Sequence, residues 1–92
     1  MIEENERGKM KMEYTTLDAY QAAYLTLRGL PVSYILQNGL IVFSFSETKE
    51  LREALRDYMN GAEVPVFQFV TRVKMLRGQV HNRKGSSENI SK

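Results

Sequence analysis

The segment SYILQNGLIVFSF, residues 33–45, places the strongest constraint on how this chain folds. At its centre, Asn38-Gly39 is a dipeptide favoured in type I′ β-turns, because both central residues of that turn need positive φ. A two-residue turn at this position fixes the register of the flanking strands. Three apolar pairs then share one face of the hairpin, which we expect to be core: Val32 with Phe45, Tyr34 with Phe43, and Leu36 with Ile41.

The second face of the hairpin is half apolar, since it carries Ile35, Leu40 and Val42 beside three polar residues. Scattered exposed apolar residues are normal, whereas a contiguous patch indicates a binding surface. Two explanations stay open: a helix or the segment KMKMEY (residues 9–14) covers this face, or a partner does. If a partner binds, the expected interface adds Phe67 and Met75, on the outward side of a third helix.

Apolar residues at helical spacing on both sides of the hairpin predict three helices. The first covers about residues 16–28, opens with a capping box at Thr15 and Asp18, and has one apolar face: Leu17, Tyr20, Tyr24 and Leu27. The second begins near Ser46 or Thr48 and ends at Asn60-Gly61. The third covers about residues 65–77, because Pro65 suits a first helical turn and the period is lost after Gly78.

This order of elements predicts the α+β class, with one small domain of order α-β-β-α-α whose antiparallel hairpin packs on the helices. The domain is expected to span residues 13–77. Residues 1–12 are expected to form a disordered or extended arm, and residues 78–92 a flexible basic tail. Within the arm, KMKMEY could form a short flanking strand, because its apolar and charged residues alternate.

Residue types that support catalysis are scarce in this chain. It contains no cysteine, and its one histidine, His81, lies in the expected tail without an orienting partner. The acids of the second helix are spaced as ion-pair partners of Lys and Arg, which is typical of a solvated helix face. We therefore expect a non-enzymatic protein with no cofactor, metal or small-molecule substrate. No apolar run is long enough to span a membrane, so we expect a cytoplasmic location.

Charge is divided unevenly along the chain. Residues 1–63 hold ten acids and seven bases, whereas residues 64–92 hold six bases and one acid. Basic side chains bind phosphate with release of counterions, so this cluster is a candidate nucleic-acid contact: Arg72, Lys74, Arg77, Arg83 and Lys84. On a helix, however, Arg72 and Lys74 fall on opposite flanks of the apolar stripe, which argues against a single basic face.

Several segments together resemble an uncharacterised family of short bacterial and phage proteins, catalogued as a domain of unknown function. They are EYTTLDAYQAAYLTLRGLP (residues 13–31), the hairpin, ETKELREALRDYMNG, and the proline-started helix with FVTRVKML. The chain departs from this pattern at Lys49, where we expect proline after the capping threonine. The resemblance covers about residues 13–77 and implies a helix, hairpin, helix, helix fold in a phage-associated or mobile-element protein. The resemblance assigns no functional residues to this chain.

Two functions remain open from the sequence. The favoured one is a non-catalytic interaction module, with a homodimer through the second hairpin face as the simplest case, because most oligomers are symmetric homo-oligomers. The alternative is a nucleic-acid-binding accessory protein that uses the basic C-terminal third. The sequence leaves the biological process and the identity of any partner open.

Overall fold

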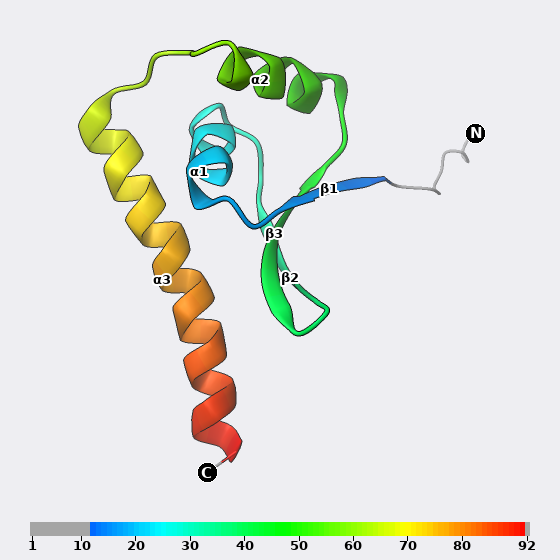
Figure 1. Ribbon diagram of the computed structural model, residues 1–92, viewed down its shortest axis with the longest axis vertical. Coiled ribbons are helices and arrows are strands. Elements are labelled where there is room, and N and C mark those ends of the chain that lie inside the picture. The colour runs from blue at the N-terminus through cyan, green and yellow to red at the C-terminus, as the bar shows by residue number, and fades with distance from the viewer. Residues whose placement is uncertain (1–11, 92) are drawn as a thin grey trace.

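The computed structural model describes residues 12–91, with side chains described as far as residue 83. The described chain forms an antiparallel sheet and three helices, which confirms the predicted α+β class (Figure 1). The elements follow one another along the chain as β1 (Glu13–Thr16), α1 (Ala19–Leu27), β2 (Ser33–Gln37), β3 (Leu40–Ser46), α2 (Lys49–Met59) and α3 (Val66–Ser91). The expected arm over residues 1–12 lies almost wholly outside the described residues.

The hairpin of β2 and β3 has the predicted turn and register. Asn38 has φ 53° and Gly39 has φ 81°, as a type I′ turn requires. Two of the three predicted apolar pairs are confirmed, Tyr34 with Phe43 and Leu36 with Ile41. The same register pairs Ser33 with Ser44, Ile35 with Val42, and Gln37 with Leu40. The remaining pair, Val32 with Phe45, lies outside the ladder because β2 begins at Ser33.

A third strand, β1, pairs with β3 and gives the sheet the order β1-β3-β2. The flanking strand suggested for KMKMEY therefore exists, but it begins at Glu13 and extends to Thr16. Tyr14 lies opposite Phe45 and its hydroxyl donates to Gln21 Oε1 at 2.6 Å, which ties β1 to α1. The element order within the described chain is accordingly β-α-β-β-α-α.

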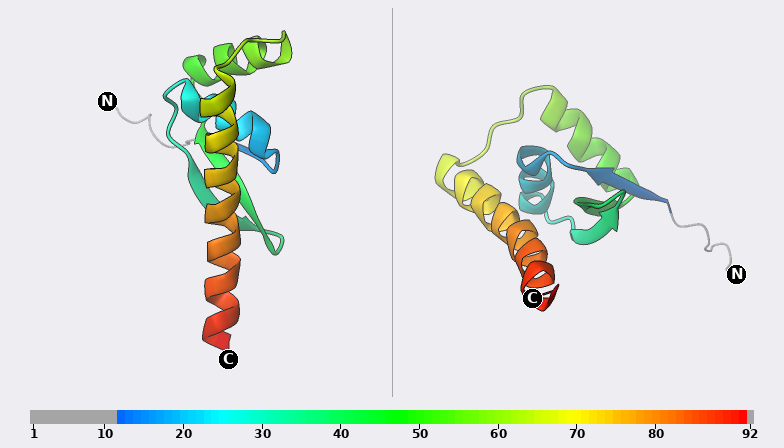
Figure 2. Two further views of the ribbon diagram at one scale, coloured as in Figure 1. Left: turned by 90° about the vertical axis from the view of Figure 1, so that its left-hand side faces the viewer. Right: turned by 60° about the horizontal axis from the view of Figure 1, so that its bottom comes forward.

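Helix α1 begins at Ala19, later than predicted, and its buried face matches the predicted one only in part: Tyr24 is buried, whereas Leu17 and Tyr20 are exposed. The Asp18 carboxylate caps it by accepting from the amides of Tyr20 and Gln21, while Thr15 belongs to β1. The buried residues of this helix include three alanines as well as two larger side chains: Ala19, Ala22, Ala23, Tyr24 and Leu25. The predicted face at Leu17 and Tyr20 is wrong, because small side chains allow α1 to pack closely between α3 and the sheet (Figure 2).

The core lies on the face of the sheet that carries Phe43 and Phe45. Phe45 is fully buried with Leu25, Leu51 and Leu76, so that each of the three helices contributes one leucine. Helix α2 is capped by Thr48, whose hydroxyl accepts from the Leu51 amide at 3.1 Å. The core therefore joins α1, α2, α3 and the central strand β3.

Helix α3 is much longer than predicted. The prediction that it ends near residue 77 is wrong, since the helix passes through Gly78 and the expected tail is helical as far as Ser91. Val80 continues the buried stripe of Val73 and Leu76 and packs against the core. One turn later, the Arg83 guanidinium lies 4.1 Å from the centre of the Tyr34 ring. These contacts to the hairpin favour helix beyond Gly78, where the sequence pattern alone indicated an end.

Replacing Gly78 by alanine tests this extension through the sign of the stability change. A Cβ at Gly78 meets no atom within 4 Å, so Gly78→Ala should raise the free energy of unfolding by about 0.5–1 kcal/mol, the usual gain within a helix. Urea unfolding followed by circular dichroism measures this change. Gly61→Ala is the matched control and should destabilise, because Gly61 has φ 83°. A loss of stability for Gly78→Ala would contradict the continuous helix.

Candidate interaction surface

The second face of the sheet has none of the described helices over it, because α1 and α3 lie against the opposite face and α2 lies across one end (Figures 1 and 2). Of the residues predicted there, Leu40 is 45% exposed and Ile35 is half-buried. Val42, on the central strand, is only 5% exposed. The available part of the predicted patch is thus Leu40 and Ile35.

One of the three polar residues on this face already has a hydrogen-bond partner. Ser44 is buried, and its hydroxyl donates to Glu13 Oε1 at 2.8 Å across the β1–β3 pair. A buried hydroxyl with a partner carries no desolvation penalty that a ligand would need to relieve. Ser44 therefore offers no unsatisfied group to a ligand, whereas Ser33 and Gln37 on the same face are exposed.

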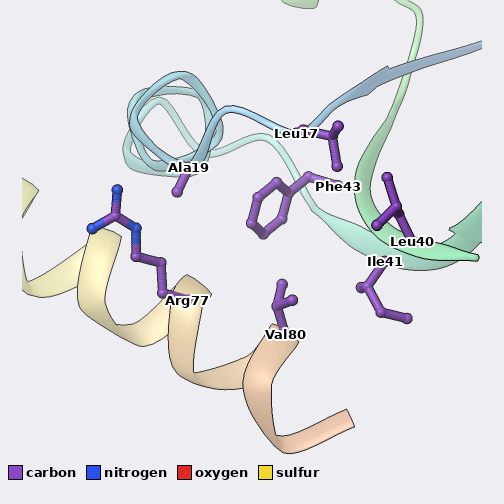
Figure 3. Close-up of a pocket in the computed structure, with 7 residues that line it drawn as sticks. All are labelled: Leu17, Ala19, Leu40, Ile41, Phe43, Arg77 and Val80. Atoms are coloured by element: carbon purple, nitrogen blue, oxygen red, sulfur yellow. The ribbon is translucent and has the colours of Figure 1, made fainter. Parts of the chain in front are cut away.

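Leu17 extends the apolar surface around Leu40. It was predicted to be core but lies in the β1–α1 connection and is 62% exposed. Leu17 and Leu40 both line a hollow of about 250 Å³ against Phe43 and Val80, in which Val80 points from α3 toward the Phe43 ring (Figure 3). They also line a second hollow of about 280 Å³ beside Val42. These two leucines therefore stand between two hollows.

Leu36 was predicted to be core and is instead 71% exposed. It lies on β2, which is an edge strand of the sheet, and only Gln37 separates it from the turn. With no described strand on its outer side, Leu36 has a neighbour on β3 only. Leu36 therefore exposes apolar area at the β2 edge, on the opposite face of the sheet from Ile35 and Leu40.

The two predicted interface residues on α3 belong to a different surface. Phe67 is 81% exposed and Met75 is about half exposed. Both line a hollow with Leu27 and Arg72. None of Ile35, Leu40 and Val42 lines this hollow, so the structure separates the five predicted interface residues into two surfaces.

The basic residues predicted to contact nucleic acid are largely engaged within the chain. Arg72 donates to Thr26 Oγ1 at 2.8 Å, which links α3 to α1. The Arg77 guanidinium lies 4.9 Å from the centre of the Tyr20 ring, and Arg83 lies over Tyr34. Burial raises the pKa of Tyr34, and the positive charges of Arg83 and Arg72 oppose that rise. These arginines bind aromatic rings and a hydroxyl of their own chain.

Lys74 and Lys84 complete the predicted basic cluster. Lys74 is exposed and lines a hollow with Tyr20 and Arg77, on the flank of α3 away from Arg72. The Lys84 side chain lies outside the described residues. Up to residue 83, the predicted basic residues therefore divide between two flanks of α3, as their helical spacing indicated.

Metal-ligating residues do not cluster in the part of the chain that the structure describes: no group of three His, Asp or Glu residues is placed to hold an ion. None of the described helices is long and apolar enough to cross a membrane. Besides the backbone of the edge strand β2, the hollows around Leu40 offer apolar side chains and a smaller set of polar ones: Thr15, Thr16, Gln37, Asn38 and Arg77. Apolar side chains bind by burial of apolar area, and an edge strand by backbone hydrogen bonding.

Comparisons with known proteins identify a family and no characterised relative. Neither the curated proteins nor the solved structures give a match to this chain. The model of one family, described as a domain of unknown function (DUF5659), matches residues 11–82. The match begins just before β1 and extends into α3 beyond Gly78, further than the resemblance over residues 13–77 implied. The chain therefore belongs to the DUF5659 family.

Proposed function

We propose that this protein is a non-catalytic interaction module that self-associates through its hairpin. The observation that carries the proposal is exposed apolar area around β2 and the turn: Leu17, Ile35 and Leu40 border the second face, and Leu36 lies on the other face at the β2 edge. Hydrophobic residues on the surface become informative when they are contiguous. Leu17 and Leu40 meet this condition, because they line the same two hollows.

Absence of charge along the hairpin supports the same function. Residues 29–46 contain no Asp, Glu, Lys or Arg, although these types make up 26% of the chain. Monomeric proteins commonly place charged side chains on exposed strands, where charge opposes association. An uncharged, partly apolar hairpin is therefore suited to burial against another protein.

An identical subunit is the simplest partner. A chain of 92 residues buries a modest fraction of its surface, so a dimer interface adds stability that the monomer core does not supply. Most soluble oligomers are also symmetric assemblies of identical chains. A cytoplasmic location and the phage or mobile-element context implied by the family resemblance form part of this proposal.

Nucleic-acid binding is the weaker alternative. It rests on the excess of basic residues after residue 63, but Arg72, Arg77 and Arg83 already contact Thr26, Tyr20 and Tyr34. A protein that follows a phosphate backbone needs basic side chains free to neutralise several phosphates. Lys74 is the described member of the cluster that is exposed without such a contact.

Self-association is tested by size-exclusion chromatography with light scattering at about 100 µM protein, high enough to populate a dimer of micromolar dissociation constant. The wild type should elute at twice the 10.6 kDa chain mass. Ile35→Lys should elute as a monomer, because it places charge on the half-buried apolar hairpin. Phe67→Lys, on the far surface of α3, is the control and should remain dimeric. Val42 is unsuitable for this test because a lysine there would disrupt a buried position.

A monomeric wild type at that concentration would overturn self-association. A dimer that dissociates with Phe67→Lys and survives Ile35→Lys would instead place the interface on α3. Circular dichroism of each variant shows whether the fold is kept, so a loss of the dimer can be separated from unfolding.

The alternative is tested by mobility shift of single- and double-stranded nucleic acid across a range of salt concentrations. The interaction module should give no shift near physiological salt. Nucleic-acid binding would appear as a shift that weakens steeply with salt and is lost in Lys74→Glu. Lys49→Glu, an equal charge change on exposed α2, is the matched control and should leave such a shift in place.

A further inference from the structure

We infer that the free edge of β2 pairs with β2 of a second copy of this chain, antiparallel and across a two-fold axis. The two three-stranded sheets then become one sheet of six strands. This inference rests on the proposed self-association and specifies its geometry. It differs from packing two sheets face to face, because its main contacts are backbone hydrogen bonds.

The outer edge of β2 has no strand beside it in the described chain. The sheet order is β1-β3-β2, so β2 pairs with β3 alone. The backbone hydrogen bonds that involve described residues outside helices and strands include none to Tyr34 or Leu36. Arg83 contacts Tyr34 through the face of its ring, which leaves the backbone at that position open.

The turn determines which backbone groups point outward from β2. In a hairpin with a two-residue loop, the residues flanking the loop form a hydrogen-bonded pair, here Gln37 with Leu40. Pairs then alternate along an antiparallel ladder, so Ser33, Ile35 and Gln37 direct their N–H and C=O groups toward β3. Tyr34 and Leu36 direct theirs away from the hairpin. The free edge therefore offers two donors and two acceptors at alternate residues.

This edge lacks the features by which proteins usually prevent strand pairing. Residues 33–37 contain no charge and no proline, and they pair one-to-one with β3, so no bulge interrupts the strand. Edges that remain unpaired are typically guarded by lysine, proline, bulges or covering elements. The other edge of the sheet, β1, is shorter and carries Glu13. Edge pairing is therefore expected at β2.

The strand expected at this edge is β2 of a second copy, because one register lets the outward backbone groups of both strands form hydrogen bonds. An axis through Ile35 puts Tyr34 opposite Leu36 of the partner subunit, so that both outward residues of each β2 form hydrogen-bonded pairs. An axis through Tyr34 would place Leu36 opposite Val32 of the partner subunit, which precedes the strand. In the first register the 71% exposed Leu36 gains an aromatic neighbour, and the absence of charge avoids like-charge pairs.

A single cysteine tests this register directly, because the chain contains no other. Ile35 would lie opposite Ile35 of the partner subunit at a non-hydrogen-bonded position, where Cα atoms are about 4.5 Å apart and a disulfide can form. Ile35→Cys should therefore give a covalent dimer on mild oxidation, seen on a non-reducing gel. Ser33→Cys is the control, since its two copies would lie about 13 Å apart and should not cross-link.

Proline at Leu36 tests the backbone hydrogen bonds. The Leu36 N–H points outward, so Leu36→Pro keeps the β2–β3 ladder and removes a donor from the dimer edge. Light scattering should show the dissociation constant of the dimer raised by about tenfold or more. Leu36→Ala, which keeps the donor, should weaken the dimer less. Leu40→Lys, on the open face and away from the edge, should leave the dimer intact.

The outcomes separate this geometry from the proposed function. A monomeric wild type overturns both. A dimer that Leu40→Lys dissociates and Leu36→Pro does not, with no cross-link at residue 35, overturns edge pairing and leaves self-association in place. If Leu36→Pro fails to fold by circular dichroism, the comparison of Ile35→Cys with Ser33→Cys decides the register alone.

Discussion

The type I′ turn at Asn38-Gly39 is the constraint on which the rest of the structure depends. It sets the register of β2 against β3, and that register places Phe43 and Phe45 on the side where α1 and α3 pack. Because side chains alternate along a strand, a slip of one residue would put Val42 and Ser44 on that side instead. Such a slip would remove two aromatic side chains from the core and leave Leu25, Leu51 and Leu76 without their central contact.

Short sequence patterns predicted the features that depend on residues adjacent in the chain. They failed for the features that depend on packing between distant elements. The hairpin register follows from the Asn-Gly turn, as the structure confirms, and Thr48 is the cap among the two candidates, Ser46 and Thr48, that the sequence offered. The buried face of α1 could not be predicted from such signals. Whether the alanines or the larger Leu17 and Tyr20 are buried depends on how closely α3 approaches α1. The length of α3 was missed for the same reason: Gly78 resembles a helix end until Val80 is seen to pack on the hairpin.

The candidate surfaces show the same division between local and tertiary information. Helical spacing correctly separated Arg72 from Lys74, but a sequence cannot distinguish a free arginine from one that lies over a tyrosine ring. Arg77 over Tyr20 and Arg83 over Tyr34 join residues 57 and 49 positions apart in the chain. An arginine over an aromatic ring stabilises by cation–π attraction and by packing of its stem. Much of the basic character of α3 therefore serves to attach that helix to the rest of the fold.

The two edges of the sheet differ in a way that bears on how this protein would assemble. If both edges were open, each added copy would expose another edge, and pairing would continue into a fibre. Here the uncharged strand β2 occupies one edge, while the other is the short β1 with Glu13 bonded to Ser44. Pairing β2 with β2 about a two-fold axis uses the open edge of both copies at once and leaves only β1 edges outside. An unguarded edge strand thus becomes compatible with a soluble dimer that grows no further.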